Sequence, residues 1–394
     1  MNGSKSCRDR IAKQIVDLPR SGIRDFFELV NTMDDVISLG IGEPDFVSSW
    51  NIREAAIYAL REGFTSYTSN LGMPAMRKAA CRYVEQEFGV GYDPATECII
   101  TVGVSEALDL ILRAVLNPGD EVVYQEPSYV SYPATVQMCF GVARPVVTIE
   151  ADKFALDPAR VEAAITKKTK VLLLNFPNNP TGANLTLPQK EAIAKIAVKH
   201  DLLVLTDEIY SELTYGERTQ TIASLPGMRE RTVFLHGVSK AFAMTGFRIG
   251  FACGPHELIE AMMKIHQYSI MCVSSLSQSA AIEALQHGKP EMEKMREEYR
   301  QRRNVIVKRL NEMGLPCVMP EGAFYAFPRI TGTGLTSKEF ATRLLQEKRV
   351  AVVPGTAFGA SGEGYVRCAY ATALPEIEIA MTRIREFLAG LQQG

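Results

Sequence analysis

Short apolar runs of strand length recur through the middle of this chain, and helical patterns separate several of them. The six runs are Cys98–Val102, Glu121–Tyr124, Val171–Leu174, Leu202–Thr206, Thr232–Leu235 and Ile249–Ala252. Runs that are apolar along most of their length are typical of strands covered on both faces. The alternation therefore predicts an α/β fold, with a mostly parallel central sheet flanked by helices.

The clearest strand–helix–strand unit starts at VLLLN and turns through FPNNPTG. A helix is expected to follow, because Thr186 and Gln189 have the spacing of a capping box and Pro188 falls in the first turn. Its later apolar positions repeat with a period near 3.6. The strand LLVLT then completes a βαβ unit.

The pattern changes after about residue 290. A long amphipathic helix is expected from Pro290 to Gly314, followed by the shorter elements GAFYAFP, VAVVPG and GYVRCAYA. We therefore predict two domains. Residues 48–290 form the large domain, and residues 1–47 and 291–394 form a small α+β domain built from both chain termini.

Composition excludes several classes of protein. The 394 residues are 46% hydrophobic and 22% charged, with a formal net charge of -2, so nothing favours nucleic acid or an anionic membrane as a partner. No apolar run approaches the roughly 20 residues of a membrane span, and the polar N-terminus lacks a secretory signal, so we expect a cytoplasmic protein. The eight cysteines contain no C-x-x-C pair and the five histidines are scattered, so we expect reduced thiols and no metal.

Chemically distinct groups follow four of the predicted strands. They are a small-residue turn with Val104 and Ser105, the amide Asn179, the carboxylate Asp207 with the phenol Tyr210, and the amine Lys240. Each alone is commonly a turn, core or surface residue. In open α/β sheets, however, ligands bind at the carboxyl ends of the strands, where these groups would meet.

The stretch GVSKAFAMTGFRIG places two cations, Lys240 and Arg248, among apolar neighbours, where an unpaired charge is costly. Pyridoxal phosphate would account for both. It needs an amine that forms an imine, a carboxylate facing its pyridine nitrogen, and a cradle for its phosphate. Lys240 would then be a neutral amine or an imine. Arg248 would be paired with phosphate, beside the backbone N–H groups of Val104 and Ser105.

The segments FPNNPTG, TDEIYSEL, GVSKAFAMTGFRIG and GYVRCAYA, in this order, resemble the class I/II aminotransferases of the fold type I pyridoxal-phosphate superfamily. The resemblance runs from about Ile37 to near the C-terminus. It implies that Lys240 is the Schiff-base lysine and the general acid and base. It also implies that Asp207 pairs with the pyridinium, and that Tyr210 and Asn179 contact the phenolate oxygen.

The same resemblance assigns the phosphate to Arg248 and to the amides of Val104 and Ser105. Tyr129, in EPSYVSY, matches the aromatic residue that stacks on the cofactor ring, with a core tyrosine as the alternative. Tyr67, in SYTSN, would reach the phosphate of a neighbouring subunit. The resemblance therefore implies a homodimer.

For the substrate, Arg367 matches the arginine that binds the α-carboxylate, together with Asn179 and a backbone contact at Gly42. Arg24, in SGIRDF, is a candidate reader of a distal carboxylate, and a solvated surface arginine is the alternative. One bacterial subgroup reads that carboxylate with a lysine near the position of Ser105.

The chain departs from the family at Gly237, where many members carry a phosphate-binding serine three residues before the lysine. Ser239, adjacent to Lys240, is the candidate replacement for that hydroxyl.

The resemblance implies an aminotransferase that moves an amino group from an L-amino acid to a 2-oxo acid, in a ping-pong cycle between pyridoxal phosphate and its aminated form. The expected acceptor is 2-oxoglutarate, and the expected donor is aspartate or an aromatic amino acid. One alternative is a β-eliminating C–S lyase on the same scaffold. A remote alternative is a pyridoxal-phosphate-sensing regulatory domain, although only about 40 residues precede GIGEPDF and they show no basic winged-helix pattern.

Overall fold

A seven-stranded sheet forms the centre of the computed structural model, which describes residues 6–18, 33–217 and 220–391. The strands lie in the order β2-β8-β7-β6-β5-β3-β4, and β8 alone runs antiparallel to its two neighbours. Their bounds are β2 Cys98–Thr101, β3 Glu121–Glu126, β4 Val142–Val147, β5 Thr169–Asn175, β6 Leu203–Asp207, β7 Thr232–Gly237 and β8 Gly250–Cys253. The predicted α/β fold with a mostly parallel sheet is confirmed.

The edge strand β4 is the one member of this sheet that the apolar runs did not predict. Most of its side chains are exposed or half-buried, and of its residues only Val146 is buried. It also contains Pro145, which an edge strand tolerates because its N–H side can face away from the sheet. A strand that buries so little leaves no continuous apolar run in the sequence.

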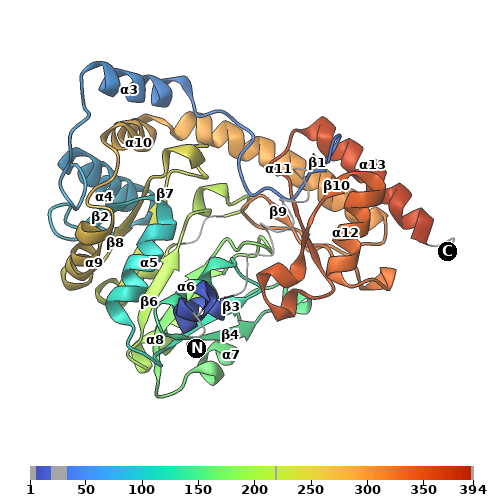
Figure 1. Cartoon of the computed structure of the whole chain (residues 1–394), viewed down its shortest axis with the longest axis horizontal. Helices are drawn as coiled ribbons and strands as arrows, with labels where there is room; N and C mark the ends of the chain where they lie inside the picture. The colour runs from blue at the N-terminus through green and yellow to red at the C-terminus, as the bar shows by residue number, and fades with distance from the viewer. Residues whose placement is uncertain (1–5, 19–32, 218–219, 392–394) are drawn as a thin grey trace, which may run out of the picture.

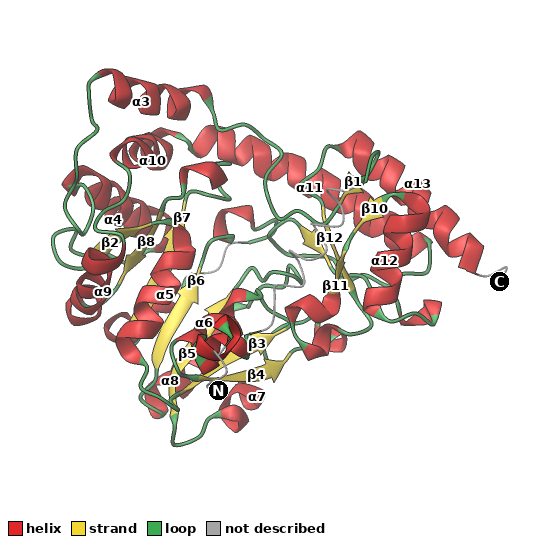
Figure 2. Cartoon of the chain, in the orientation of Figure 1, coloured by secondary structure: helices red, strands yellow, loops and turns green. Residues whose placement is uncertain are grey.

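Helices cover both faces of the sheet (Figure 2). The helices α5 (Gly103–Val115), α6 (Ser131–Met138) and α9 (His256–Ser269) pack on one face. The other face carries α7 (Pro158–Ala164) and α8 (Leu187–Lys199), with α4 (Pro74–Phe88) and α10 (Ser275–His287) over the end formed by β2 and β8. In β5, Val171 and Leu173 pack with the helices α5, α6 and α9 on one face. Leu172 and Leu174 pack with α7 and α8 on the other face, because successive side chains of a strand point to opposite sides.

The capping box predicted for α8 is present. The Thr186 side chain accepts a hydrogen bond from the backbone N–H of Gln189, and the Gln189 side chain accepts one from the backbone N–H of Thr186. Pro188 lies in the first turn, and Ile193 is fully buried against the sheet. This local signal explains why the βαβ unit was readable from the sequence.

A smaller group of helices and strands, here called the C-terminal layer, lies beside the central sheet. It follows the long helix α11 (Lys289–Glu312), which runs from the neighbourhood of α10 toward the C-terminal elements (Figure 1). Those elements are β9 (Tyr325–Ala326), α12 (Ser337–Lys348), β10 (Val350–Ala351), β11 (Val353–Pro354), β12 (Val366–Ala369) and α13 (Leu374–Leu391). Near the N-terminus, β1 (Ile37–Ser38) pairs in parallel with β10. Both ends of the chain thus contribute to this layer, while the domain boundaries themselves stay a prediction.

Two more helices precede the sheet in the chain: the short α1 (Lys13–Val16), and α3 (Trp50–Arg61), which packs on α10. Among the described residues, no helix combines the length and apolar composition that crossing a bilayer requires.

We expect Thr186→Ala to lower the free energy of unfolding by about 1 kcal/mol, because the change leaves the N-terminal N–H groups of α8 without their side-chain acceptor. Urea denaturation followed by circular dichroism measures this. Thr382→Ala is the matched control, since Thr382 is exposed in the interior of α13 and caps nothing. An equal loss in both variants would contradict the assigned cap.

Candidate active site

The carboxyl ends of β2, β5, β6 and β7 lie along one edge of the sheet. β5, β6 and β7 are parallel, and β2 runs in the same direction because β8 is antiparallel to both β7 and β2. In the ladder, Asn175 pairs with Asp207 and Asp207 pairs with Leu235. The turns that carry Asn179, Asp207 and Lys240 therefore leave the sheet side by side.

Lys240 lies half-buried at this edge. Its Nζ donates a hydrogen bond to the carbonyl oxygen of Gly42 at 2.7 Å. Burial lowers the pKa of Lys240 to about 8; Glu43 opposes this shift, and the positive charges of Arg367 and Arg248 add to it. A lysine whose pKa is lowered in this way supplies a much larger fraction of neutral amine near neutral pH than a surface lysine does.

Asp207 is buried at the end of β6. Its carboxylate accepts hydrogen bonds from the Tyr132 hydroxyl at 2.8 Å and from the backbone N–H of Ile209 at 3.2 Å. Burial raises the pKa of Asp207 to about 6, although both hydrogen bonds act to lower it. Such a carboxylate is ionised above that pH and would be stabilised by a cationic ligand nitrogen.

Arg367, on β12, reaches the same region from the C-terminal layer. It is 2% exposed, and its guanidinium donates to Asn179 Oδ1 at 2.9 Å and to the Gly40 carbonyl at 2.6 Å. The rings of Tyr325 and Phe358 lie 4.4 Å and 4.8 Å from its Cζ. Its Nε has no hydrogen-bond partner among the described residues. A buried guanidinium with an unsatisfied N–H is ready to bind a carboxylate.

Tyr210, which follows β6 of the central sheet, contacts Tyr325 on β9 of the C-terminal layer. Their hydroxyls lie 2.8 Å apart, and their rings pack edge to face with centroids 5.7 Å apart. Because Tyr325 also lies under Arg367, it orients both the phenol at the end of β6 and the guanidinium on β12.

The turn before α5 provides a space for an anion. No side chain caps this helix, and a Cβ added to Gly103 would lie 2.6 Å from Arg248 Nη2. A Cβ on Gly250 would lie 2.5 Å from the backbone nitrogen of Val104. Glycines therefore let the backbone and the guanidinium approach the first turn, which carries Val104 and the exposed Ser105. A helix start with uncapped N–H groups beside a guanidinium suits a phosphate.

Arg248 is exposed and donates to the carbonyl of Thr245 at 3.1 Å. Its pairing with phosphate stays a prediction. Apolar neighbours suggested burial, but Thr245–Phe247 form a surface 3-10 turn and Arg248 follows it with φ of 53°. The side chain leaves the apolar stretch through this turn, which keeps its charge in water.

The glycine at 237 is explained by close packing. A Cβ there would lie 2.8 Å from the carbonyl oxygen of Ile249 and 3.0 Å from Gly250 Cα. The phosphate-binding serine of other family members does not fit this pairing of β7 with β8. Ser239 is buried beside Lys240, and its role stays a prediction.

The remaining predicted residues are less closely gathered. Tyr129 packs edge to face on Tyr132, with centroids 5.6 Å apart. Tyr67 is 83% exposed, and Arg24 lies outside the described residues. The carbonyl of Gly42 accepts from Lys240, so a substrate carboxylate would have to use its N–H group.

Sequence reasoning missed Tyr132, Tyr325, Phe358 and Gly40. Tyr132 stands three residues after Tyr129 in EPSYVSY, one helical turn away, and could have been noticed by that spacing. Tyr325 lies in GAFYAFP, which was interpreted only as an element of the small domain. Nothing local marks Gly40 or Phe358, because their contacts with Arg367 arise from packing across the chain.

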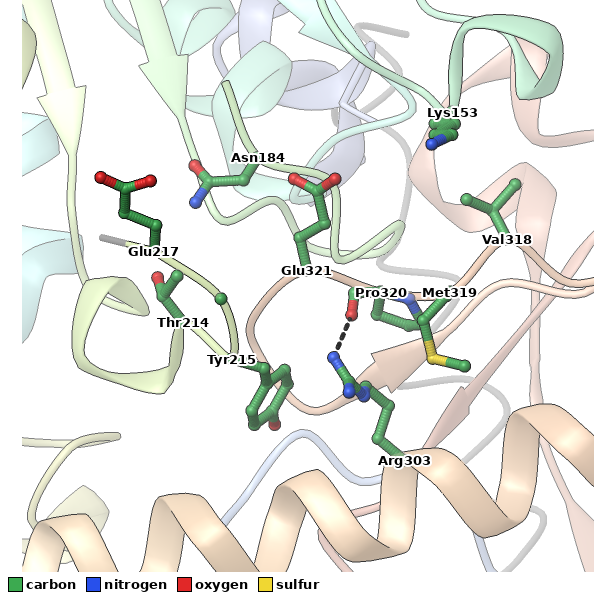
Figure 3. A pocket seen from close by; sticks show the side chains of 11 residues that line it. Lys153, Asn184, Thr214, Tyr215, Glu217, Arg303, Val318, Met319, Pro320 and Glu321 are labelled. Atoms are coloured by element: carbon green, nitrogen blue, oxygen red, sulfur yellow. Dashed lines mark hydrogen bonds between the residues drawn. The ribbon is translucent and has the colours of Figure 1, made fainter. Parts of the chain in front are cut away.

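A separate surface cavity of about 400 Å³ contains none of the predicted site residues. It is lined by residues 214–217, by residues 318–321 and by Lys153, Asn184 and Arg303 (Figure 3). Arg303 donates to the carbonyl of Pro320 at 2.9 Å and lies 4.7 Å from the ring centre of Tyr215. These contacts hold the turn that precedes β9, the strand that carries Tyr325.

The groups at the sheet edge fit pyridoxal phosphate. The Lys240 amine has a lowered pKa, and the buried Asp207 carboxylate has no ion-pair partner among the described residues. The glycines leave a cradle beside Arg248, and the buried Arg367 guanidinium has an unsatisfied N–H. Together they would hold an aldehyde, a ring nitrogen, a phosphate and a substrate carboxylate.

Comparison with known proteins agrees with this chemistry. The profile of the family "Aminotransferase class I and II" matches residues 34–384. The chain therefore belongs to the class I and II aminotransferases, which use pyridoxal phosphate.

Individual relatives cover nearly the whole chain. YugH of Bacillus subtilis is 50% identical over 378 residues, which are 96% of this chain and 98% of that one. An aspartate aminotransferase of Pyrococcus abyssi is 46% identical over 371 residues, covering 93% of this chain and 95% of its own. The crystal structure of an aromatic aminotransferase from Pyrococcus horikoshii superposes with a TM-score of 0.89 at 46% identity, covering 93% and 99% of the two chains. The protein is an aminotransferase.

We expect Arg248→Gln to raise the pKa of Lys240 above about 8, because a nearby positive charge disfavours the protonated amine. The measurement is the pH dependence of acetylation at Lys240 in cofactor-free protein, followed by peptide mass spectrometry. Arg144→Gln is the control, since Arg144 pairs with Glu121 at the far edge of the sheet. An unchanged or lower midpoint in Arg248→Gln would contradict the coupling.

Proposed function

We propose that this aminotransferase takes its amino group from aspartate or an aromatic amino acid and passes it to 2-oxoglutarate, using the residues at the sheet edge. The observation that supports this most directly is the buried Arg367 with its unsatisfied Nε, because an amino acid presents a carboxylate of matching geometry.

The cofactor would be held by residues from both layers. Bound pyridoxal phosphate supplies an aldehyde for amines and a ring that accepts the electron pair left when the Cα proton departs. Asp207 would hold the ring-nitrogen proton, and Tyr210 and Asn179 would donate to the ring oxygen. Arg248 and the N–H groups of Val104 and Ser105 would bind the phosphate.

Lys240 would carry the proton transfer. Its pKa of about 8 lets the Nζ amine accept a proton from substrate Cα and release it again near neutral pH. Arg367 would bind the α-carboxylate through its guanidinium and so fix the direction of the Cα–H bond. Tyr325 positions the Arg367 guanidinium. Tyr129 would cover the cofactor ring and so exclude water from it.

The choice of donor rests on two observations. The buried rings of Tyr325 and Phe358 pack on the Arg367 guanidinium, so the surroundings of the proposed carboxylate site are aromatic and would suit an aromatic donor. The relatives include an aspartate aminotransferase and an aromatic aminotransferase. Arg24 remains the proposed partner of a distal carboxylate.

The test is to add single amino acids to the purified holoenzyme without any oxo acid and to record the visible absorbance. We expect aspartate, or phenylalanine and tyrosine, to convert the cofactor band, and Lys240→Ala to abolish turnover while Lys264→Ala retains it. A response to aspartate but not phenylalanine would identify a distal-carboxylate reader. Release of pyruvate and ammonia as the main products would instead indicate a lyase and contradict the proposal.

We further propose a homodimer. The outer face of α3 and the loop after it expose large apolar side chains, which monomeric proteins rarely gather in one place. They include Trp50 at 62%, Tyr58 at 58%, Leu60 at 57% and Tyr67 at 83% exposure. A second copy covering this face would bring Tyr67 to the neighbouring site.

Sedimentation velocity is expected to give twice the chain mass of 43.5 kDa. Leu60→Asp should shift the protein toward the monomer, because it places a charge in the proposed interface. Val198→Asp is the matched control, since Val198 is exposed on α8 instead. A wild-type protein that sediments as a monomer would overturn the dimer without affecting the reaction.

A further inference from the structure

Three cysteines from distant parts of the chain meet inside the protein. Cys81 lies on α4, Cys98 begins β2 and Cys253 ends β8. Their Sγ atoms all lie within 4.8 Å of one another, and the residues are 5%, 0% and 0% exposed. Cys98 is at the start of β2, whereas the turn that carries Val104 and Ser105 follows the carboxyl end of the same strand. The cysteine cluster therefore lies at the end of β2 that faces away from the candidate active site.

The backbone holds the three thiols in place. Cys98 and Cys253 are directly paired residues of the antiparallel β2–β8 ladder, and Gly254 extends the pairing by donating to the carbonyl of Glu97 at 3.1 Å. Cys81 comes from α4, which packs on β2. With metal–sulfur bonds of about 2.3 Å, tetrahedral geometry requires sulfur atoms about 3.8 Å apart. The cluster would need to contract by no more than about 1 Å to meet that geometry.

An unsatisfied oxygen belongs to the same core. Tyr92 packs in one hydrophobic cluster with the three cysteines and is 7% exposed, and its hydroxyl has no hydrogen-bond partner among the described residues. A buried hydroxyl without a partner is costly, and a ligand in this core would satisfy it.

Charged groups of both signs stand close to this core. Arg77 is 9% exposed and donates to the carbonyls of Gly72 and Ala95. The Arg229 guanidinium lies 5.1 Å from the ring centre of Tyr92 and pairs with Glu97 at 2.7 Å. Asp93 and Glu97 both act on Cys81, so two guanidiniums are balanced by two carboxylates around the cluster.

We propose that Cys81, Cys98 and Cys253 form a binding site for one soft divalent cation of the zinc class, in the same core as the unsatisfied Tyr92 hydroxyl. Thiolates select such cations over hard ones such as Mg²⁺. Three thiols release three protons to solvent when the cation binds, so three thiolates and one dication give a complex of net charge -1. Sequence spacing predicted no metal, because the ligands come from three separate elements rather than from a C-x-x-C pair.

A cation at this site would stabilise the attachment of the edge strand β2 to the rest of the protein. β2 is an edge strand of four residues, held by β8 on one side only. A cation bound to α4, β2 and β8 would join that edge to its covering helix, away from the residues that hold the cofactor.

The experiment uses the holoenzyme expressed in zinc-supplemented medium and purified without a histidine tag. Zinc per chain is measured by elemental mass spectrometry after gel filtration. We expect about one zinc per chain in the wild type and at least a tenfold loss in Cys81→Ser. Cys139→Ser is the matched control, because Cys139 is a buried cysteine at the end of α6, outside the cluster, and should retain the metal. A wild type without zinc, or equal zinc in Cys81→Ser, would overturn the proposal.

A second measurement needs no variant to fold. Removing zinc from the wild type with a chelator should lower Tm by several degrees, and adding Cd²⁺ should produce the ultraviolet charge-transfer band of a thiolate complex. A disulfide between two of these three cysteines, mapped by peptide mass spectrometry under non-reducing conditions, would also overturn the proposal. The cofactor's visible absorbance, recorded in parallel, reports on the separate active site.

Discussion

Two cations, the half-buried Lys240 and the buried Arg367, have no ion-pair partner among the described residues, and the rest of the site is arranged around this constraint. An amine and a guanidinium removed from water are costly unless their environment is polar and fixed in advance. Lys240 donates to one backbone carbonyl, and Arg367 donates to a carbonyl and an amide oxygen. These neutral acceptors stabilise the cations only partly, which leaves both able to bind carbonyl and carboxylate groups of a substrate.

The constraint also explains why the two layers of the molecule must meet. Arg367 comes from β12, whereas its acceptors come from the segment after β1 and from the turn after β5. The hydroxyl pair of Tyr210 and Tyr325 makes a second connection between the same layers. Substrate-binding and cofactor-binding groups therefore lie on different parts of the fold, and their relative position depends on how α11 and the C-terminal elements pack against the sheet.

Burial at the carboxyl ends of the strands shifts the pKa values of Asp207 and Lys240 in opposite directions. Burial acts on both, and it raises the pKa of Asp207 to about 6 while it lowers the pKa of Lys240 to about 8. Between these pH values the carboxylate is mostly ionised, and the amine is mostly protonated with a usable fraction in the neutral form. One residue can then hold positive charge on a ligand while the other exchanges protons with it. The same effect on an isolated surface pair would be far smaller, because water would solvate both charges.

Local periodicity and the direction of parallel strands were enough to predict the α/β class, six strands of the sheet, the capped helix α8 and the chemical groups that follow four of the strands. Four sequence segments in a fixed order also identified the family. Four contacts could not be predicted in this way: Tyr132 donates to Asp207, Tyr325 lies under Arg367, Arg248 leaves its apolar stretch for the surface, and three cysteines meet in the core. Those contacts join residues far apart in the chain or depend on one local turn, and strand register and packing fix them where periodicity cannot.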